Sequence, residues 1–574
     1  MKTTLRKNSI LTFIIVSCII ALAFGIRYLH LVGDPPVADI SRSGVFYMDE
    51  GTYAHNVVNK ILFGTWFIPN EYNAIANTPV FSIFQYIVLK SFGVSLVSLR
   101  TGGILYAILF LLILWVTLRN MNPYGALLAL VLGSINYFLF IYNRLALLEN
   151  MLLLVLMLIT LFLFFYMRRQ QIIWLISAII LFWAGYFIKA TILFFLPLII
   201  LTIILQPLPL RRKLKHLWVY FSVSSIILVL LYFIWVKPFA FDWQYFQARN
   251  IHRMIGKSTP ILLINYGRYL VNLKLFQFMP VMYTIALFYI GILGTEFFNK
   301  KKLPFWDWYF VAWYFCGILF LGFFAYSPPR FSLILMPALL VLMTRFFIRT
   351  YTRDISLSRR ALLGIFVPLG VLILCQIGFG IFRIIAYDTI YLSCFLPLLS
   401  IPALIVLFYL QRNKTSAPRI VFGLIASILI INAVQIFEYF HTIKYSYYTA
   451  IMDMKKVIEA QHQPENILMG DIASLVSIEL RMKAVNINFR SDTEVNRILQ
   501  NEPNLMILQD KKELDRLTHK LPDYLSNVQL IKTYKILDNY VTNDDTYFYR
   551  IQHNHEKSKM AAFGSDKKQE KSVQ

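Results

Sequence analysis

Two adjacent carboxylates, Asp49 and Glu50, stand early in the chain in the run Tyr47-Met48-Asp49-Glu50-Gly51-Thr52-Tyr53. A carboxylate can take a proton from a hydroxyl group as that hydroxyl attacks a substrate, provided that the two groups lie within hydrogen-bonding distance. For an isolated pair the alternative is a solvated loop or a helix N-cap. Asp49 and Glu50 are therefore candidates for general-base chemistry if other functional groups accompany them.

Four more ionisable residues stand where apolar segments begin or end: Arg144, Glu149, Lys189 and Arg330. Charges beside apolar runs are costly and usually face a cavity or a partner. The structural alternatives are a snorkelling Arg144, a Glu149 that favours a helix N-terminus, and interfacial anchors at Lys189 and Arg330. Arg grips a phosphate through two donors and Lys acts as a point charge. Together the three cations favour a lipid phosphate as ligand.

The elements that must position these residues are membrane spans. Of 574 residues 58% are hydrophobic and only 15% charged, and the mean hydropathy is +0.61. A helix needs about 20 apolar residues to cross a bilayer core. We predict thirteen spans, near 10–31, 99–118, 126–140, 147–167, 172–188, 192–205, 217–236, 275–298, 305–324, 331–348, 361–382, 390–410 and 420–440. The first is long and lacks a cleavage site, so we expect a retained anchor.

The net charge of +25 is best explained by topology and not by nucleic acid. With the N-terminus in the cytoplasm, the cytoplasmic connectors hold 21 basic residues against only Glu296, Asp307 and Asp354, as the positive-inside rule requires. The two long connectors, 32–98 and 237–274, then lie outside, and so do the candidate site residues. Apolar periodicity in the first of them predicts interfacial helices around Tyr53 to Leu62 and Phe81 to Val88.

The chain becomes conventionally soluble after His441, with 19 basic and 18 acidic residues. We therefore predict a transmembrane domain at 1–441, an extracytoplasmic α/β domain at 442–554 and a disordered tail at 555–574. The pattern of apolar and β-forming residues predicts strands near 466–469, 484–489, 504–508, 528–537 and 546–551, and helices are predicted near 474–481 and 511–519.

The order of these features resembles the GT-C membrane glycosyltransferases, and within them the branch of the protein O-mannosyltransferases and the lipid A aminoarabinose transferases. The residues that carry the resemblance are Asp49-Glu50 with Tyr53, Leu62-Phe63-Gly64, Pro79, Phe92-Gly93, Arg100, Asn143-Arg144, Glu149, Lys189, Pro329-Arg330-Phe331 and Pro337. The resemblance implies a GT-C-like helical fold, to which the roughly thirteen predicted spans would belong, and a polyprenyl-phosphate-linked sugar donor used on the non-cytoplasmic face.

By the same resemblance, Asp49 is the general base and Glu50 its support, with Tyr53 beside them. Arg144, Lys189 and Arg330 would hold the donor phosphate, and Glu149 would position one of these cations. The chain departs from its relatives at two points. Asn77-Thr78-Pro79 stands where two prolines are frequent, and Phe331 stands where Tyr is frequent, which removes a hydroxyl from the phosphate site.

Some GT-C relatives need a divalent metal, and His55 with Asp49, Glu50 or Glu149 offers suitable ligand types. A single His is more often a surface residue, so we assign no metal or other cofactor. The expected partners are the donor lipid, an unidentified acceptor and membrane lipids. Two alternatives remain: a transporter or flippase of a lipid-linked or anionic solute, and a noncatalytic assembly protein. Transporters place their functional charges near the bilayer midplane, where the predicted spans are almost free of charge.

Overall fold

The computed structural model describes residues 2–34, 45–69, 71–244, 274–324, 328–352, 354–355, 358–387, 395–412, 417–460, 466–470, 472–486, 500–508, 511–520, 525, 527–534 and 546–551. The chain divides into two compact units. The helical unit comprises Met1–Ser41, Ile75–Val88 and Val97–Ile443, and the sheet unit comprises Arg42–Ala74, Leu89–Leu96 and Lys444–Gln574. Most of the predicted outer loop 237–274 and the whole tail 555–574 lie outside the described residues.

Nine helices of the described chain are long and apolar enough to cross a membrane. Each satisfies its own backbone hydrogen bonds, which a segment in lipid must do. They are α1 (Lys2–Tyr28), α5 (Leu96–Arg119), α8 (Leu148–Arg169), α11 with η3 (Leu210–Val236), α15 (Pro280–Phe298), α16 (Phe305–Gly322), η4 with α17 (Pro329–Tyr351), α18 (Arg359–Tyr387) and α21 (Ala417–Thr442). The chain is therefore a multi-span, mostly helical membrane protein.

The predicted span 126–140 is wrong as a single straight helix. It is a pair, α6 (Pro123–Ile135) and α7 (Tyr137–Asn143), bent by 60°. The break is at Asn136, whose backbone leaves the helical region at φ −59° and ψ 120°. Its side-chain oxygen then accepts a hydrogen bond from the backbone N–H of Leu139 at 2.9 Å, so the same residue ends one helix and caps the next.

Three other predicted spans coincide with shorter apolar helices: α9 (Ile172–Tyr186), η2 with α10 (Ala190–Leu205), and η5 with α20, apolar over Leu396–Leu410. A helix therefore corresponds to each of the thirteen predicted spans. Only nine, or ten with the bent pair counted as one, have the length and apolar character to cross a membrane among the described residues. The number thirteen is not confirmed.

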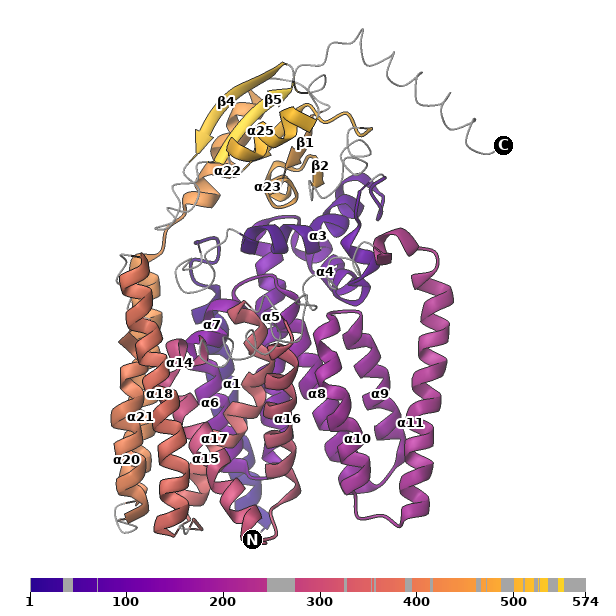
Figure 1. Cartoon of the computed structure of the whole chain (residues 1–574). Helices are drawn as coiled ribbons and strands as arrows, with labels where there is room; N and C mark the ends of the chain where they lie inside the picture. The colour runs from indigo at the N-terminus through magenta and orange to yellow at the C-terminus, as the bar shows by residue number, and fades with distance from the viewer. Residues whose placement is uncertain are drawn as a thin grey trace. The chain divides into compact units, whose positions relative to one another are not determined.

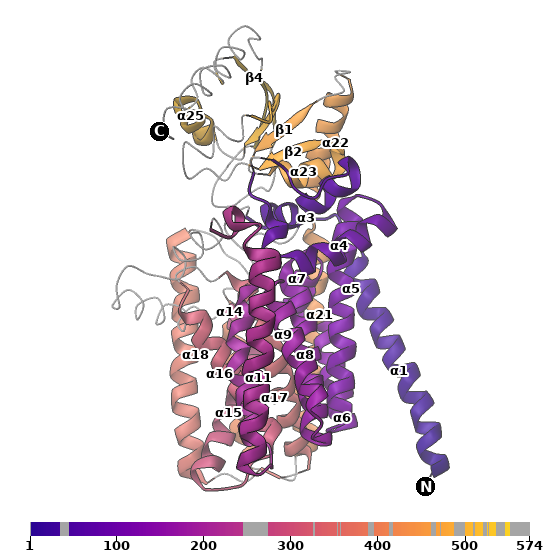
Figure 2. The same cartoon turned by 90° about the vertical axis from the view of Figure 1, so that its right-hand side faces the viewer.

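Helix α17 lies at the centre of the helical unit. It packs against α6, α15, α16 and α21, and 83% of the η4–α17 apolar window is buried, against 11% for α11. Figures 1 and 2 show α11 running beside α9 and α10, with which it makes contact. Exposed apolar side chains such as Trp218 and Phe221 cover α11, as expected of a helix that faces lipid.

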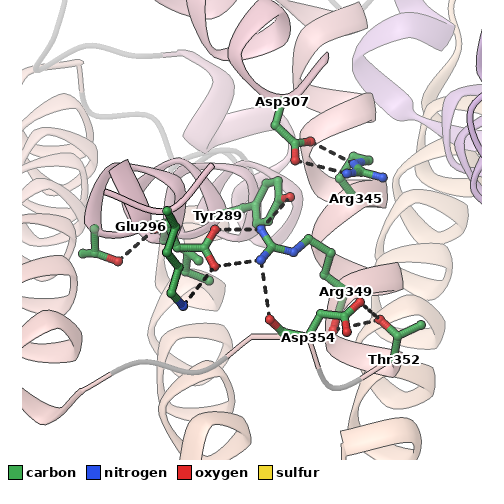
Figure 3. A network of polar contacts seen from close by, with 10 residues as sticks. Tyr289, Glu296, Asp307, Arg345, Arg349, Thr352 and Asp354 are labelled. Carbon is green, nitrogen blue, oxygen red and sulfur yellow. Dashed lines mark hydrogen bonds and ion pairs between the residues drawn. The ribbon is translucent and has the colours of Figure 1, made fainter. Parts of the chain in front are cut away.

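Buried ion pairs hold one end of α17 (Figure 3). Arg349 donates to both carboxylate oxygens of Glu296 on α15, at 2.7 and 2.9 Å. One turn earlier, Arg345 donates to both oxygens of Asp307 on α16, at 2.8 and 3.1 Å. The side chains of Glu296 and Asp307 are 4% and 1% exposed. Because both arginines belong to one helix and the acids to two others, the pairs fix the position of α17 against its neighbours.

The sheet unit contains a five-stranded sheet in the order β2-β1-β3-β5-β4. Its strands are β1 (Ile467–Gly470), β2 (Lys483–Asn486), β3 (Leu505–Leu508), β4 (Val528–Tyr534) and β5 (Thr546–Ile551). Strands β1, β2 and β3 are parallel, whereas β5 is antiparallel to both β3 and β4. All five predicted strands are confirmed, and so are the two predicted helices, α23 (Ala473–Leu480) and α25 (Lys511–Lys520). Helix α22 (Ser446–Glu459) was not predicted.

Part of the predicted first outer loop packs in the sheet unit. The periodicity predicted two helices in the loop 32–98, and α3 (Val45–Phe63) and α4 (Pro79–Phe92) confirm them. Helix α3 belongs to the sheet unit, whereas α4 belongs to the helical unit as far as Val88. Helix α3 packs against α23, and Gly51 of α3 lies in that contact. A Cβ added at Gly51 would lie 2.5 Å from the backbone nitrogen of Leu475, so the two helices can approach this closely only at a glycine. The predicted domain boundary after His441 stays a prediction.

Candidate active site

Three of the predicted site residues form one buried cluster in the helical unit. Glu149 lies in the first turn of α8, Lys189 precedes η2 (Ala190–Phe195), and Arg330 is in η4 (Pro329–Leu335). Glu149 Oε1 is 2.5 Å from Lys189 Nζ and 3.3 Å from Arg330 Nε. The exposed fractions of these side chains are 2%, 14% and 8%. Connectors far apart in the sequence therefore bring two cations onto one carboxylate.

The local sequence explains how each of these side chains is presented. Leu147 has extended backbone angles, so α8 begins just before Glu149, and a carboxylate in a first turn is favoured by the helix dipole. Lys189 itself is extended, at φ −159° and ψ 126°, between the end of α9 and the start of η2. Pro328 and Pro329 open η4, since proline suits the first positions of a helix.

Phe331 contributes its ring face to the cluster. Lys189 Nζ lies 4.2 Å and the guanidinium carbon of Arg330 5.8 Å from the centre of that ring. Attraction between a cation and an aromatic face does not need a hydroxyl group. The departure from Tyr at this position therefore leaves an aromatic contact with both cations in place.

The cluster has the composition of an anion site. Lys189, Arg330 and Glu149 together carry a formal charge of +1, and burial strengthens charge interactions relative to water. Arg and Lys form short, charge-assisted hydrogen bonds to phosphate oxygens. Glu149 contacts both cations and so holds them on the same side of α8.

Arg144 has a different set of partners. Its guanidinium donates to the backbone oxygens of Arg27, Leu29 and His30 at 2.8, 2.6 and 2.7 Å. These carbonyls lie at the end of α1, where helical carbonyls lack partners within the helix. The guanidinium also lies 5.0 Å from the centre of the Tyr439 ring. Arg144 therefore caps α1, and the prediction that it binds the donor phosphate stays a prediction.

Two further buried arginines, not predicted as site residues, hold the same region. Arg27 donates to the backbone oxygen of Ser134 at 2.8 Å. Arg100 donates to those of Leu31 and Gly33 at 2.9 and 3.1 Å. Both are at most 1% exposed. An ionisable residue inside a predicted span was the signal that could have identified them. Their contacts hold α1 against α6 and fix residues Leu31 to Gly33, which follow α1.

Asp49 and Glu50 lie within α3, in the sheet unit, and not in a loop. Glu50 is fully buried, and Asp49 and Tyr53 are partly buried. On the same helix, His55 Nε2 lies 2.9 Å from Glu71 Oε1, an acid that the sequence reasoning did not select. The histidine considered for a metal site thus pairs with Glu71. Among the described residues, no group of three or more His, Cys, Asp or Glu could hold a metal ion, and the expectation of no metal stays a prediction.

Comparison with known proteins indicates which proteins share this fold. Residues 76–235 match the family model described as dolichyl-phosphate-mannose-protein mannosyltransferase. No curated protein matches the chain. Among solved structures, ArnT from Cupriavidus metallidurans is similar in its undecaprenyl-phosphate-bound form, at TM-score 0.56 and 14% identity, covering 93% of this chain and 97% of that one. Its apo form gives 0.57 and 13%, with the same coverage.

The archaeal oligosaccharyltransferase AglB from Archaeoglobus fulgidus matches at a TM-score of only 0.42 and 10% identity, over 88% of this chain and 70% of that one, and we draw nothing from it. The ArnT likeness extends over nearly the whole of both chains and shows a shared fold. Together with the family match over residues 76–235, it supports the resemblance to the GT-C membrane glycosyltransferases.

Proposed function

We propose that the protein moves a sugar from a polyprenyl-phosphate-linked donor to an acceptor on the non-cytoplasmic face of the membrane, with inversion at the anomeric carbon. The observation that carries this proposal is the buried cluster of Glu149, Lys189 and Arg330. It supplies fixed cations next to apolar helices, where the phosphate of a membrane lipid would lie. The undecaprenyl phosphate bound to the similar ArnT structure supports a donor of this kind.

The reaction is a single displacement. An acceptor hydroxyl oxygen forms a bond to the anomeric carbon while the bond from that carbon to the phosphate oxygen breaks, and the electron pair leaves with the polyprenyl phosphate. Attack from the side opposite the phosphate inverts the configuration. Lys189 and Arg330 stabilise the charge that develops on the departing phosphate, and Glu149 keeps both in position.

Asp49 takes the proton of the acceptor hydroxyl, with Glu50 and Tyr53 as support. Arg144 contributes to the donor site by holding the end of α1 in place, because its described hydrogen bonds go to the backbone carbonyls at that end. We infer a cytoplasmic N-terminus from the charge of the connectors.

The test begins with a strain that lacks the gene. Mass spectrometry of its lipids and glycoconjugates should find an accumulated polyprenyl-phosphate sugar and one missing sugar. The accumulated lipid, once purified, then serves as donor for wild-type protein and variants, with membranes of the deletion strain as acceptor. Asp49→Asn should lower the transfer rate by about 10²-fold or more while binding of undecaprenyl phosphate is retained.

Lys189→Gln and Arg330→Gln should weaken binding of undecaprenyl phosphate and lower transfer. Asp515→Asn and Lys301→Gln are matched controls, because Asp515 is an exposed residue of α25 in the sheet unit and the Lys301 side chain is 53% exposed. Transfer at the wild-type rate by correctly inserted Asp49→Asn protein would refute its assignment as the base. Movement of the lipid across the bilayer without transfer would instead identify a flippase.

A further inference from the structure

The sheet unit contains a cavity of about 550 Å³. It lies at the amino ends of the parallel strands, where Ile467 begins β1 and Lys483 begins β2. The end of α22, the turn before β3 and Phe63 at the end of α3 complete its lining. Volumes of roughly 300–1,000 Å³ are usual for small-molecule sites, so the cavity can hold a ligand of several polar groups.

The charged side chains of the lining have both signs. Lys455, Arg481 and Lys483 are the cations, and Glu459 and Glu502 are the acids. Within the part of the chain that the structure describes, no ion pair joins these cations to these acids. Lys483 Nζ does lie 5.8 Å from the centre of the Phe63 ring. The cavity therefore offers hydrogen-bond donors and acceptors together with one aromatic ring.

A buried amide in the lining lacks a partner for its donor. Asn466 is 8% exposed, and its Oδ1 accepts a hydrogen bond from Asn504 Nδ2 at 2.9 Å. Asn504 Oδ1 in turn accepts from the backbone N–H of Ile467 at 2.8 Å, which sets the orientation of both amides. The Nδ2 of Asn466 has no hydrogen-bond partner among the described residues. A buried donor left unsatisfied is costly, so this group calls for an acceptor atom in the cavity.

Two charged residues of the lining have left-handed backbone angles. Arg481 is the C-cap of α23 at φ 53°, and Glu502 has φ 51°. Glycine is the usual residue at such positions because a Cβ is unfavourable there. The chain has a long charged side chain at both, and both line the cavity.

We infer that this cavity binds a saccharide, and that the saccharide is the acceptor glycan of the transfer reaction; this second part rests on the proposed function. Each sugar hydroxyl both donates and accepts hydrogen bonds, which suits a lining of cations, carboxylates and amides. A simple anion is disfavoured by Glu459 and Glu502, and a simple cation by the three basic residues. An apolar ligand would leave the Asn466 donor unpaired.

The test uses purified full-length protein and four probes: mannotetraose, maltotetraose, chitotetraose and tetragalacturonic acid. Binding is followed by saturation-transfer NMR, with a twelve-residue Ser/Thr-rich peptide as the competing class of acceptor. Arg481→Gly and Glu502→Gly remove side chains from the lining while easing the backbone, so the fold is retained. Gln170→Gly is the matched control, because Gln170 has φ 56° in the helical unit. Asn466→Asp removes the unpaired donor.

At least one saccharide should bind, and each of the three cavity variants should weaken that binding 10-fold or more. Gln170→Gly should have no effect, and none of the four should change binding of undecaprenyl phosphate. Absence of binding by all four saccharides overturns the inference, as does binding that the cavity variants leave unchanged. Cavity-dependent binding of the peptide alone overturns it in favour of a protein acceptor. Loss of undecaprenyl phosphate binding in Lys189→Gln, measured in parallel, reports on the proposed function separately.

Discussion

Replacement of Gly51 by alanine should separate activity from folding more clearly than any other single change. The new Cβ would lie 2.5 Å from the backbone nitrogen of Leu475, 2.6 Å from its Cβ and 2.7 Å from Ser474 Oγ. Neither the nitrogen nor the Cβ of Leu475 can rotate away, because the first is a backbone atom and the second is bonded directly to the backbone. Carbon atoms pack at roughly 3.5–4.0 Å, so α3 has to withdraw from α23 by about 1 Å.

The energetic effect on folding is modest. Overpacking usually costs about 1–3 kcal/mol, and alanine returns about 1 kcal/mol of helix propensity relative to glycine. A net loss of no more than about 2 kcal/mol leaves most of the protein folded. The effect on activity should be larger, because Asp49 and Glu50 directly precede Gly51 on the displaced helix. A misplacement of about 1 Å can lower a rate by about 10²-fold.

The measurement is the initial rate of sugar transfer, with donor lipid purified from the deletion strain and membranes of that strain as acceptor. Binding of undecaprenyl phosphate and thermal unfolding in detergent are measured on the same protein. Gly25→Ala is the control, since Gly25 lies in α1 with no atom within 4 Å of an added Cβ. Transfer by Gly51→Ala at the wild-type rate would refute the reasoning, as would an equal loss in Gly25→Ala.

Two further predictions concern parts of the chain away from the proposed chemistry. Glu296→Gln should lower the free energy of unfolding by about 3 kcal/mol or more, because it leaves the Arg349 guanidinium without its buried acid. In chemical denaturation, the double variant Glu296→Gln with Arg349→Gln should recover part of this loss. Equal losses of unfolding free energy in the single and double variants would contradict the pairing. In the sheet unit, hydrogen bonds from Lys532 and Tyr534 hold the pKa of Asp453 below its usual range. A carboxyl group whose pKa is lower in the folded protein than in the unfolded chain stabilises the fold at pH values above the unfolded pKa, about 4. This stabilisation is lost as the pH falls through the lower pKa of the folded state. The difference in denaturation midpoint between wild type and Asp453→Asn should therefore shrink from pH 6 to pH 3, and a constant difference would contradict it.

Helix and strand positions followed closely from the sequence because each depends on a local pattern. Long apolar runs predicted helices at all thirteen places, and short runs of apolar and β-forming residues predicted every strand of the sheet. The break at Asn136 was missed, because capping depends on a side-chain oxygen reaching the N–H of Leu139, and hydropathy does not report this. Helix α22 was missed although its buried residues, Tyr447, Ala450, Ile451 and Met454, have the spacing of an amphipathic helix.

The candidate site was predictable as a set of residue types but not as an arrangement. Glu149, Lys189 and Arg330 were selected because charge beside an apolar run is costly, and this reasoning applies to one residue at a time. It applied equally to Arg144, whose partners turned out to be the carbonyls at the end of α1. The same argument, extended into the spans, would have found Arg27 and Arg100.

By itself the sequence determined the apolar membrane segments and most of the helix and strand positions, because these depend on the transfer of side chains from water to lipid and on short-range geometry. Only the tertiary structure decided which charges meet. It joined Glu149 to Lys189 and Arg330 across three connectors, turned Arg144 toward α1, and packed Gly51 against α23. Coulomb energy and steric contact depend on distances between residues far apart in the chain, and those distances exist only in the folded protein.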